Sequence, residues 1–169
     1  MINLDDLFGE KYRKNDGKPI IYKGKEIIGI DRISVPKKFK VAIRLISTNS
    51  EWKQAVDVKV NGKIYLKDGG EAKHFALWES LFRDEPEDNG CVICTGTSND
   101  GIFLVWNAWE NKGTRTRHDA WTGNGGMIKE EIREGVYRYY CNDGHLDKYR
   151  PIDFDDIIFE VEVINQEKK

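Results

Sequence analysis

The sequence contains no apolar run of the roughly 18 to 20 residues that a membrane-spanning helix requires. Its start, Met1 to Phe8, lacks the basic region and the long apolar stretch of a signal peptide. Cysteine is scarce as well: Cys91, Cys94 and Cys141 are too few for the disulfide framework of a small secreted domain. These absences predict a cytoplasmic protein with no membrane partner.

A strong net charge is also missing, because the chain carries only −2 and therefore has no general attraction to nucleic acid. Basic residues outnumber acidic ones in residues 1–50, whereas acidic residues prevail in the remainder. Such a basic face either contacts an acidic partner or simply solvates the surface. The hydrophobic content of 39% is that of an ordinary globular domain, and 169 residues suffice for one full core.

Three parts are predicted along the chain: an N-terminal segment over residues 1–17, a single domain over 18–165 and a disordered tail over 166–169. Asn3 is a suitable N-cap for a short helix in the first fifteen residues, with Leu4, Leu7 and Phe8 as its apolar side. Neither an internal repeat nor a Pro/Ser-rich linker divides the remainder.

From Ile20 onward the apolar residues recur with a period of two, which is typical of β-strands. A hairpin is predicted over residues 20–30, with its turn at Lys23-Gly24. A second hairpin is predicted over residues 55–66, because Asn61-Gly62 favours a type I′ turn after the alternating valines. Further strands are predicted at 41–46, 74–78, 91–95, 102–109, 127–133, 136–141 and 157–163.

About nine or ten short strands separated by turns predict an all-β fold, namely a single antiparallel β-sandwich of the jelly-roll type. A barrel of similar strand count fits the same pattern. A doubly wound fold is disfavoured, because no long helix is available to cover a parallel sheet.

Two long polar loops, over residues 110–126 and 142–156, interrupt the strands, and such loops on a β scaffold often carry function. Tryptophan and tyrosine gather around them, and these rings offer apolar faces on which sugars can stack. The alternative is that the aromatic residues fill the core. The candidate ligand-binding residues are Trp121, Trp109, Asn107, Glu110, His118 and Asn124.

The second loop is rich in carboxylates, which are the hard oxygen ligands that calcium prefers. The candidate calcium ligands are Asp143, Asp147, Asp153, Asp155 and Asp156. Their spacing is not that of an EF-hand. Alternatively, the aspartates accept hydrogen bonds from nearby backbone N–H groups and order the turn.

The segment Asp153-Phe-Asp-Asp-Ile-Ile-Phe-Glu-Val covers nine of the 169 residues. It resembles the Asp-Phe-Asn/Asp-Asp-Leu/Ile-Val/Ile motif that opens a late strand in some bacterial β-sandwich domains, beside a presumed calcium site. The resemblance implies that Asp153, Asp155 and Asp156 are calcium ligands.

Cysteine and histidine suggest a different metal. Two pairs of residues could supply the four ligands of a structural zinc site: Cys91 with Cys94, and Cys141 with His145. A strand over residues 91–95 would, however, turn Cys91 and Cys94 to opposite faces. The alternative is that the cysteines are buried as small hydrophobic residues.

Catalysis has little support, because the sequence contains no triad motif and no phosphate-binding loop. The pairs that could act as base and nucleophile are His118 beside Asp119, and His145 with Cys141. The sequence therefore favours a non-enzymatic recognition module for a glycan or another polar ligand, with or without calcium. The alternatives are a cytoplasmic protein-interaction module of the immunity or inhibitor type, and a small hydrolase with a histidine-based site.

Overall fold

The computed structural model describes residues 8, 11, 18–67, 69–83, 90–110, 118–121, 125–144, 152 and 154–164. Its elements are β1 (Ile20–Tyr22), β2 (Lys25–Ile27), β3 (Asp31–Ser34), β4 (Lys38–Thr48), β5 (Gln54–Tyr65), β6 (Glu71–Trp78), α2 (Glu79–Arg83), β7 (Cys91–Trp109), β8 (Gly126–Arg133), β9 (Val136–Asn142) and β10 (Ile157–Val163). Within these residues, no helix has the length and apolarity needed to cross a membrane.

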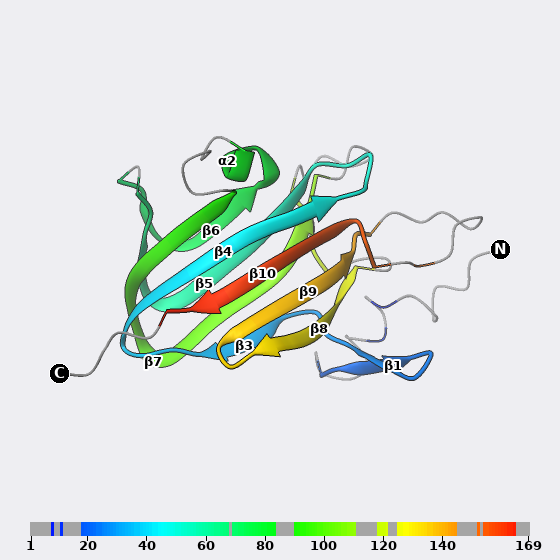
Figure 1. Ribbon diagram of the computed structural model, residues 1–169, viewed down its shortest axis with the longest axis horizontal. Coiled ribbons are helices and arrows are strands. Elements are labelled where there is room, and N and C mark those ends of the chain that lie inside the picture. The colour runs from blue at the N-terminus through cyan, green and yellow to red at the C-terminus, as the bar shows by residue number, and fades with distance from the viewer. Residues whose placement is uncertain are drawn as a thin grey trace.

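Eight strands form one antiparallel sheet (Figure 1). Seven of them run in the order β6-β5-β7-β4-β10-β9-β8, and β3 lies outside this order. Strand β3 pairs with the second half of β7, next to the half that pairs with β4. Just before β3, Ile28 exchanges two backbone hydrogen bonds with Met127 of β8, at the far edge of the sheet. The described strands thus enclose the core without closing into a barrel, which confirms the predicted all-β, sandwich-like fold.

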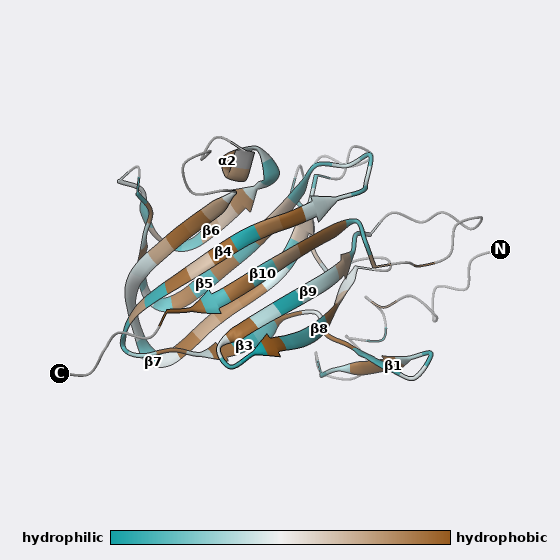
Figure 2. Cartoon of the chain, viewed as in Figure 1, coloured by the Kyte–Doolittle hydropathy of each residue, from teal (hydrophilic) through white to brown (hydrophobic). Residues whose placement is uncertain are grey.

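The core lies on the inner face of this sheet. Val41 and Ile43 of β4 and Val56 and Val58 of β5 are fully buried there. Apolar and polar residues alternate along β4, β10 and β9 (Figure 2), as expected for strands with one face on a core. Burial of each such side chain contributes about 1.5–3 kcal/mol.

Two smaller elements extend the core at opposite ends of the sheet (Figure 1). Helix α2 places Phe82 against the main core with almost no exposure. The β1–β2 hairpin turns at Lys23-Gly24, as predicted, and lies against β8. It encloses a second, smaller cluster in which Phe8 stacks on Phe154 at a centroid distance of 6.0 Å.

The predicted hairpin turn at Asn61-Gly62 is wrong, because β5 runs through this position as one continuous strand. A Cβ on Gly62 would lie 2.1 Å from the carbonyl oxygen of Thr97, and one on Gly96 would lie 1.9 Å from that of Lys63. Both glycines therefore permit the close approach of β5 and β7, at the point where their register shifts. The tendency of Asn-Gly to turn is overridden because β5 stays paired with β7 through Val60 and Gly62, while its pairing with β6 resumes at Ile64.

Other differences from the sequence prediction are smaller. The strands predicted at 91–95 and 102–109 are parts of a single 19-residue strand, β7. Phe8 and Lys11 are helical, at two positions of the predicted N-terminal helix. The rest of that segment and the predicted tail over 166–169 lie outside the described residues.

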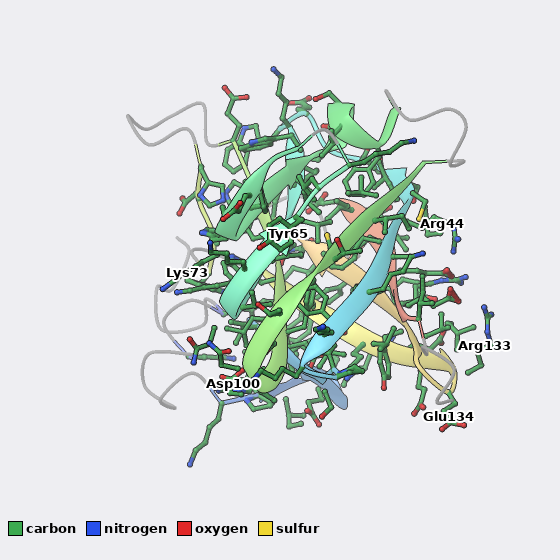
Figure 3. All side chains as sticks on the ribbon, turned by 90° about the vertical axis from the view of Figure 1, so that its left-hand side faces the viewer. Arg44, Tyr65, Lys73, Asp100, Arg133 and Glu134 are labelled. Carbon is green, nitrogen blue, oxygen red and sulfur yellow. The ribbon has the colours of Figure 1, made fainter. Side chains whose placement is uncertain are left out.

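The outer face over β4, β10 and β9 is charged. Glu160 lies 2.7 Å from Arg138 and 3.8 Å from Arg44, while Arg133 lies 3.1 Å from Glu162. Figure 3 shows Arg44 and Arg133 on this side of the molecule. Since exposed ion pairs each contribute about 0–1 kcal/mol, this face is mainly a solvated surface.

A buried tyrosine joins β3 to β8 and β9. The Tyr139 hydroxyl donates a hydrogen bond to Asp31 Oδ2 at 2.5 Å, and the same oxygen lies 2.8 Å from Lys129 Nζ. The Tyr139 ring stacks on Phe159 at a centroid distance of 4.9 Å. Burial raises the pKa of Tyr139, and the negative charge of Asp31 raises it further, so the hydroxyl keeps its proton and donates it.

We expect Tyr139→Phe to lower the free energy of unfolding by about 1–3 kcal/mol, because it removes the donor to a largely buried carboxylate. Tyr140→Phe is the matched control, since its hydroxyl bonds to Glu130 in an exposed position; it should change the stability by about 0.5 kcal/mol or less. Urea denaturation measures both. Equal effects of the two substitutions would contradict a structural role for the Tyr139–Asp31 bond.

Candidate functional site

The candidate site is built around Asp57, a fully buried carboxylate in the middle of β5. Since Val56 and Val58 point into the core, Asp57 points to the opposite face of the sheet. Its cross-strand partners on that face are Ala76 of β6 and Trp106 of β7. A carboxylate in such surroundings needs hydrogen-bond donors, because an unpaired buried charge is strongly unfavourable.

Two histidines supply these donors. His118 Nε2 lies 2.7 Å from Asp57 Oδ2, and His74 Nε2 lies 3.3 Å from the same oxygen. His74 is on β6, whereas His118 lies in the segment that follows β7 and bridges back to it through Asp119 and Trp109. The two side chains are 41% and 38% exposed, so a buried anion lies behind two accessible imidazoles.

Burial raises the pKa of Asp57, and the charge and hydrogen bonds of His118 and His74 act in the opposite direction. The second carboxylate oxygen, Oδ1, is buried and has no hydrogen-bond partner among the described residues. Within the described part of the chain, the two imidazoles are consequently the groups that stabilise this buried carboxylate by hydrogen bonding.

Three indole rings surround the histidines. Trp106 lies beneath, with its ring centroid 5.3 Å from that of His74 and 5.1 Å from that of Trp121. Trp78 meets His118 edge to face at 5.9 Å. Of the three, Trp121 is the exposed one, with 43% of its surface accessible.

Trp121 is held firmly in an unfavourable backbone conformation. Its φ of 60° is in the left-handed region, which costs a bulky residue of order 1–3 kcal/mol. The indole Nε1–H donates to the carbonyl of Gly29 at 2.6 Å, and the ring rests on Trp106. These contacts offset the strain and fix the ring at the surface.

The arrangement combines an aromatic surface with two oriented imidazoles. A carboxylate that orients an imidazole is also found in catalytic triads, where the histidine acts as the base. In the part of the chain that the structure describes, no three His, Cys, Asp or Glu side chains form a group that could hold a metal ion. Nε2 of His74 and Nε2 of His118 each contact Asp57 directly.

The structure brings together two of the predicted ligand-binding residues, Trp121 and His118. Trp109 and Asn107, in contrast, are buried, and the Asn107 amide donates to the carbonyl of Asn142 at 2.9 Å. These two predictions are corrected: Trp109 is fully buried and pairs with Gln54 and Asp119, while Asn107 is 2% exposed and its amide is used inside the protein. Glu110 is half-buried, 4.0 Å from Lys53, and Asn124 lies outside the described residues.

The pairing of His118 with its neighbour Asp119 is not the one observed. His118 bonds to Asp57, 61 positions away in the sequence. Asp119 Oδ1 instead accepts a hydrogen bond from the N–H of Ala120 at 2.9 Å. His145, the other histidine of the catalytic hypothesis, lies outside the described residues.

The described aspartates of the acidic loop accept hydrogen bonds at the end of the sheet. Asp143 Oδ2 accepts from Ser50 and Gln54, at 2.6 and 2.9 Å. Asp156 Oδ2 accepts from the backbone N–H of Asp143 at 2.8 Å. Asp155 Oδ2 accepts from the Asn49 side chain at 2.9 Å, so among these contacts of the described residues only the Asp156 carboxylate accepts from a nearby backbone N–H group. Asp147 and Asp153 lie outside the described residues.

The cysteines do not converge on a zinc site. Cys91 and Cys94 are on β7, whereas Cys141 is on β9, and β4 and β10 lie between these strands. With roughly 4.8 Å between neighbouring strands, the three thiols cannot share one tetrahedral ion. Burial raises the pKa of Cys94 to about 12 and also raises that of Cys141, so both remain thiols.

Sequence reasoning missed Asp57 and His74. Asp57 alternates with valines, which is the pattern of a residue facing water, but its side chain is fully buried in the structure. The signal that could have found them is cross-strand: β5 and β6 form a hairpin that places Asp57 opposite Ala76 and Lys59 opposite His74. The predicted turn at Asn61-Gly62 concealed that register.

A scan against protein-family models and searches of curated proteins and of solved structures found no match for this chain. The site is therefore interpreted from its geometry alone.

We expect all three thiols to be inert toward Ellman's reagent in the native protein at about pH 8, since all are buried. After unfolding in guanidinium, all three should react. Rapid native labelling of Cys94 or Cys141 would contradict their burial, and stoichiometric zinc in the purified protein would contradict the separation of the cysteines.

A double-mutant cycle with Asp57→Leu and His118→Ala should show a coupling energy of about 1 kcal/mol in the free energy of unfolding. A charge-assisted hydrogen bond contributes roughly 1.5–3 kcal/mol, and the exposure of His118 reduces that value. The control cycle uses Asp119→Ala with His118→Ala and should show a smaller coupling. A larger coupling to Asp119 would refute the assignment of Asp57 as the partner.

Proposed function

We propose that this chain is a recognition module that binds a glycan or a similar polyhydroxylated ligand at the surface formed by Trp121, Trp78, His74 and His118, hereafter the indole–imidazole surface. The observation that carries the proposal is an exposed indole, rigidly held on Trp106, whose ring also contacts one of the two imidazoles that a buried carboxylate orients.

The Trp121 ring is suited to stacking because it is accessible and already ordered. Its only polar atom, Nε1, is satisfied by Gly29, and Trp106 supports the ring from one side. Binding therefore costs little loss of side-chain freedom, which is the general advantage of a preorganised site. The apolar face of a sugar ring is the natural partner for such an indole face.

The imidazoles provide the polar half of the recognition. Both contact Asp57 through Nε2, which leaves the second ring nitrogen, Nδ1, for a ligand. A ligand with an apolar ring face and a rim of hydroxyl groups complements this combination. That description fits a sugar better than a purely apolar molecule or a small ion.

The second candidate is a small hydrolase that uses His118 as a general base. The 2.7 Å contact between His118 Nε2 and Asp57 Oδ2 favours it, because catalytic histidines are oriented in this way. Mass spectrometry of an array-identified glycan after prolonged incubation distinguishes the two functions. Recognition alone leaves the glycan intact, whereas a hydrolase shortens it.

The proposal is tested by a glycan array, followed by calorimetric titration of the strongest hit. Trp121→Ala should weaken binding about tenfold or more, since one stacked ring contributes roughly 1–3 kcal/mol. Tyr65→Ala is the matched control, because Tyr65 is 42% exposed but lies at the end of β5 (Figure 3). An array without hits, or hits that Tyr65→Ala weakens as much as Trp121→Ala does, would refute the proposal.

A further inference from the structure

We infer that Asp57 is a positioning residue that holds the proton of both histidines on Nε2, so that His74 and His118 each present an unprotonated Nδ1 to the ligand. The indole–imidazole surface then selects ligands that donate hydrogen bonds. This inference rests on the proposed function for its ligand class, although not for the role of Asp57.

The protonation pattern follows from counting donors and acceptors at one oxygen. His118 Nε2 and His74 Nε2 both contact Asp57 Oδ2, at 2.7 and 3.3 Å. A carboxyl protonated on Oδ2 could donate to only one of these nitrogens, so the two rings would then play different roles at that oxygen. An ionised carboxylate oxygen accepts from both rings, so both contacts are satisfied when each Nε2 carries a hydrogen.

In a neutral imidazole with its hydrogen on Nε2, Nδ1 is an acceptor. No described residue forms a hydrogen bond with Nδ1 of His74 or His118. The nearest rings, those of Trp106 and Trp78, contact the histidines through their π systems. Among the described residues, the two Nδ1 atoms are therefore acceptors without a donor, on accessible side chains.

The two imidazoles are neighbours, and their acceptors define the ligand chemistry. The ring centroids of His74 and His118 are 6.3 Å apart, which is within the span of one sugar ring and its hydroxyl groups. A sugar hydroxyl can donate to an imidazole nitrogen, whereas a carboxylate or phosphate dianion has only acceptors to offer. Neutral glycans should consequently bind better than anionic ligands of the same size.

The role of Asp57 is tested by nitrogen-15 NMR of the histidine rings at about pH 8, where an ordinary imidazole is neutral. The background variant His145→Gln removes the signals of the third histidine. We expect both remaining rings to show a protonated, pyrrole-type Nε2 and an unprotonated, pyridine-type Nδ1. A pyridine-type Nε2 on either ring would overturn the inference.

Two substitutions of Asp57 separate its role as an acceptor from its charge and its volume. Asp57→Asn retains a carbonyl oxygen that can accept from both rings, so the Nε2–H pattern should persist. Asp57→Leu fills the same space without an acceptor, so the ring signals should move to the averaged values of free histidine. If the pattern persists in Asp57→Leu as well, Asp57 does not determine it and the inference fails.

The ligand class is tested by titrating methyl α-D-mannopyranoside, methyl β-D-galactopyranoside and methyl β-D-glucuronide, with the Trp121 indole signal as the readout. We expect the neutral glycosides to bind more tightly than the glucuronide, and Asp57→Leu to lose about tenfold in affinity while Asp57→Asn retains it. Tighter binding of the glucuronide overturns the selectivity. If no glycoside binds, the ligand class and the proposed function both fail, and the NMR pattern alone then decides the role of Asp57.

Discussion

The pairing of β5 with β7 is the constraint on which the rest of this structure depends. Along its 19 residues β7 has β5 on one side and both β4 and β3 on the other, so it links the two halves of the sheet. Gly62 and Gly96 make the pairing sterically feasible, since a side chain at either position would collide with the opposite carbonyl. The same register places Asp57 beside Trp106 and thereby fixes the centre of the site.

At the centre of the site, the unfavourable burial of Asp57 serves to orient its hydrogen-bond donors. A carboxylate removed from water is tolerated only with donors close to it, and His74 and His118 provide them from β6 and from the segment after β7. The donors are thereby held in one orientation, and Trp121 is held beside them despite its strained backbone. Strain and buried charge at one location are typical of functional sites rather than of purely structural surfaces.

Features that depend on the local alternation of apolar and polar residues could be predicted from the sequence. The strand Ile157–Val163 was predicted with the bounds it has, because its apolar side chains alternate regularly. The site could be predicted only in part: His118 and Trp121 come from the expected loop, but Asp57 and His74 meet them through pairing between distant strands. Asn61-Gly62 shows why, since a strong local turn signal was overridden by the pairing of β5 with the distant strand β7. The hydrogen-bond partner of Asp57 likewise lies 61 positions away, at His118.

In the proposed binding mode, a buried carboxylate orients two imidazoles toward a ligand that lies on Trp121. A crystal structure of the protein with a neutral glycan from the array would show this arrangement. We expect a sugar ring against the exposed face of Trp121, with hydroxyl groups within hydrogen-bonding distance of Nδ1 of His74 and His118 and with both Nε2–Asp57 contacts intact. A glycan bound elsewhere, or one that displaces either imidazole from Asp57, would contradict it.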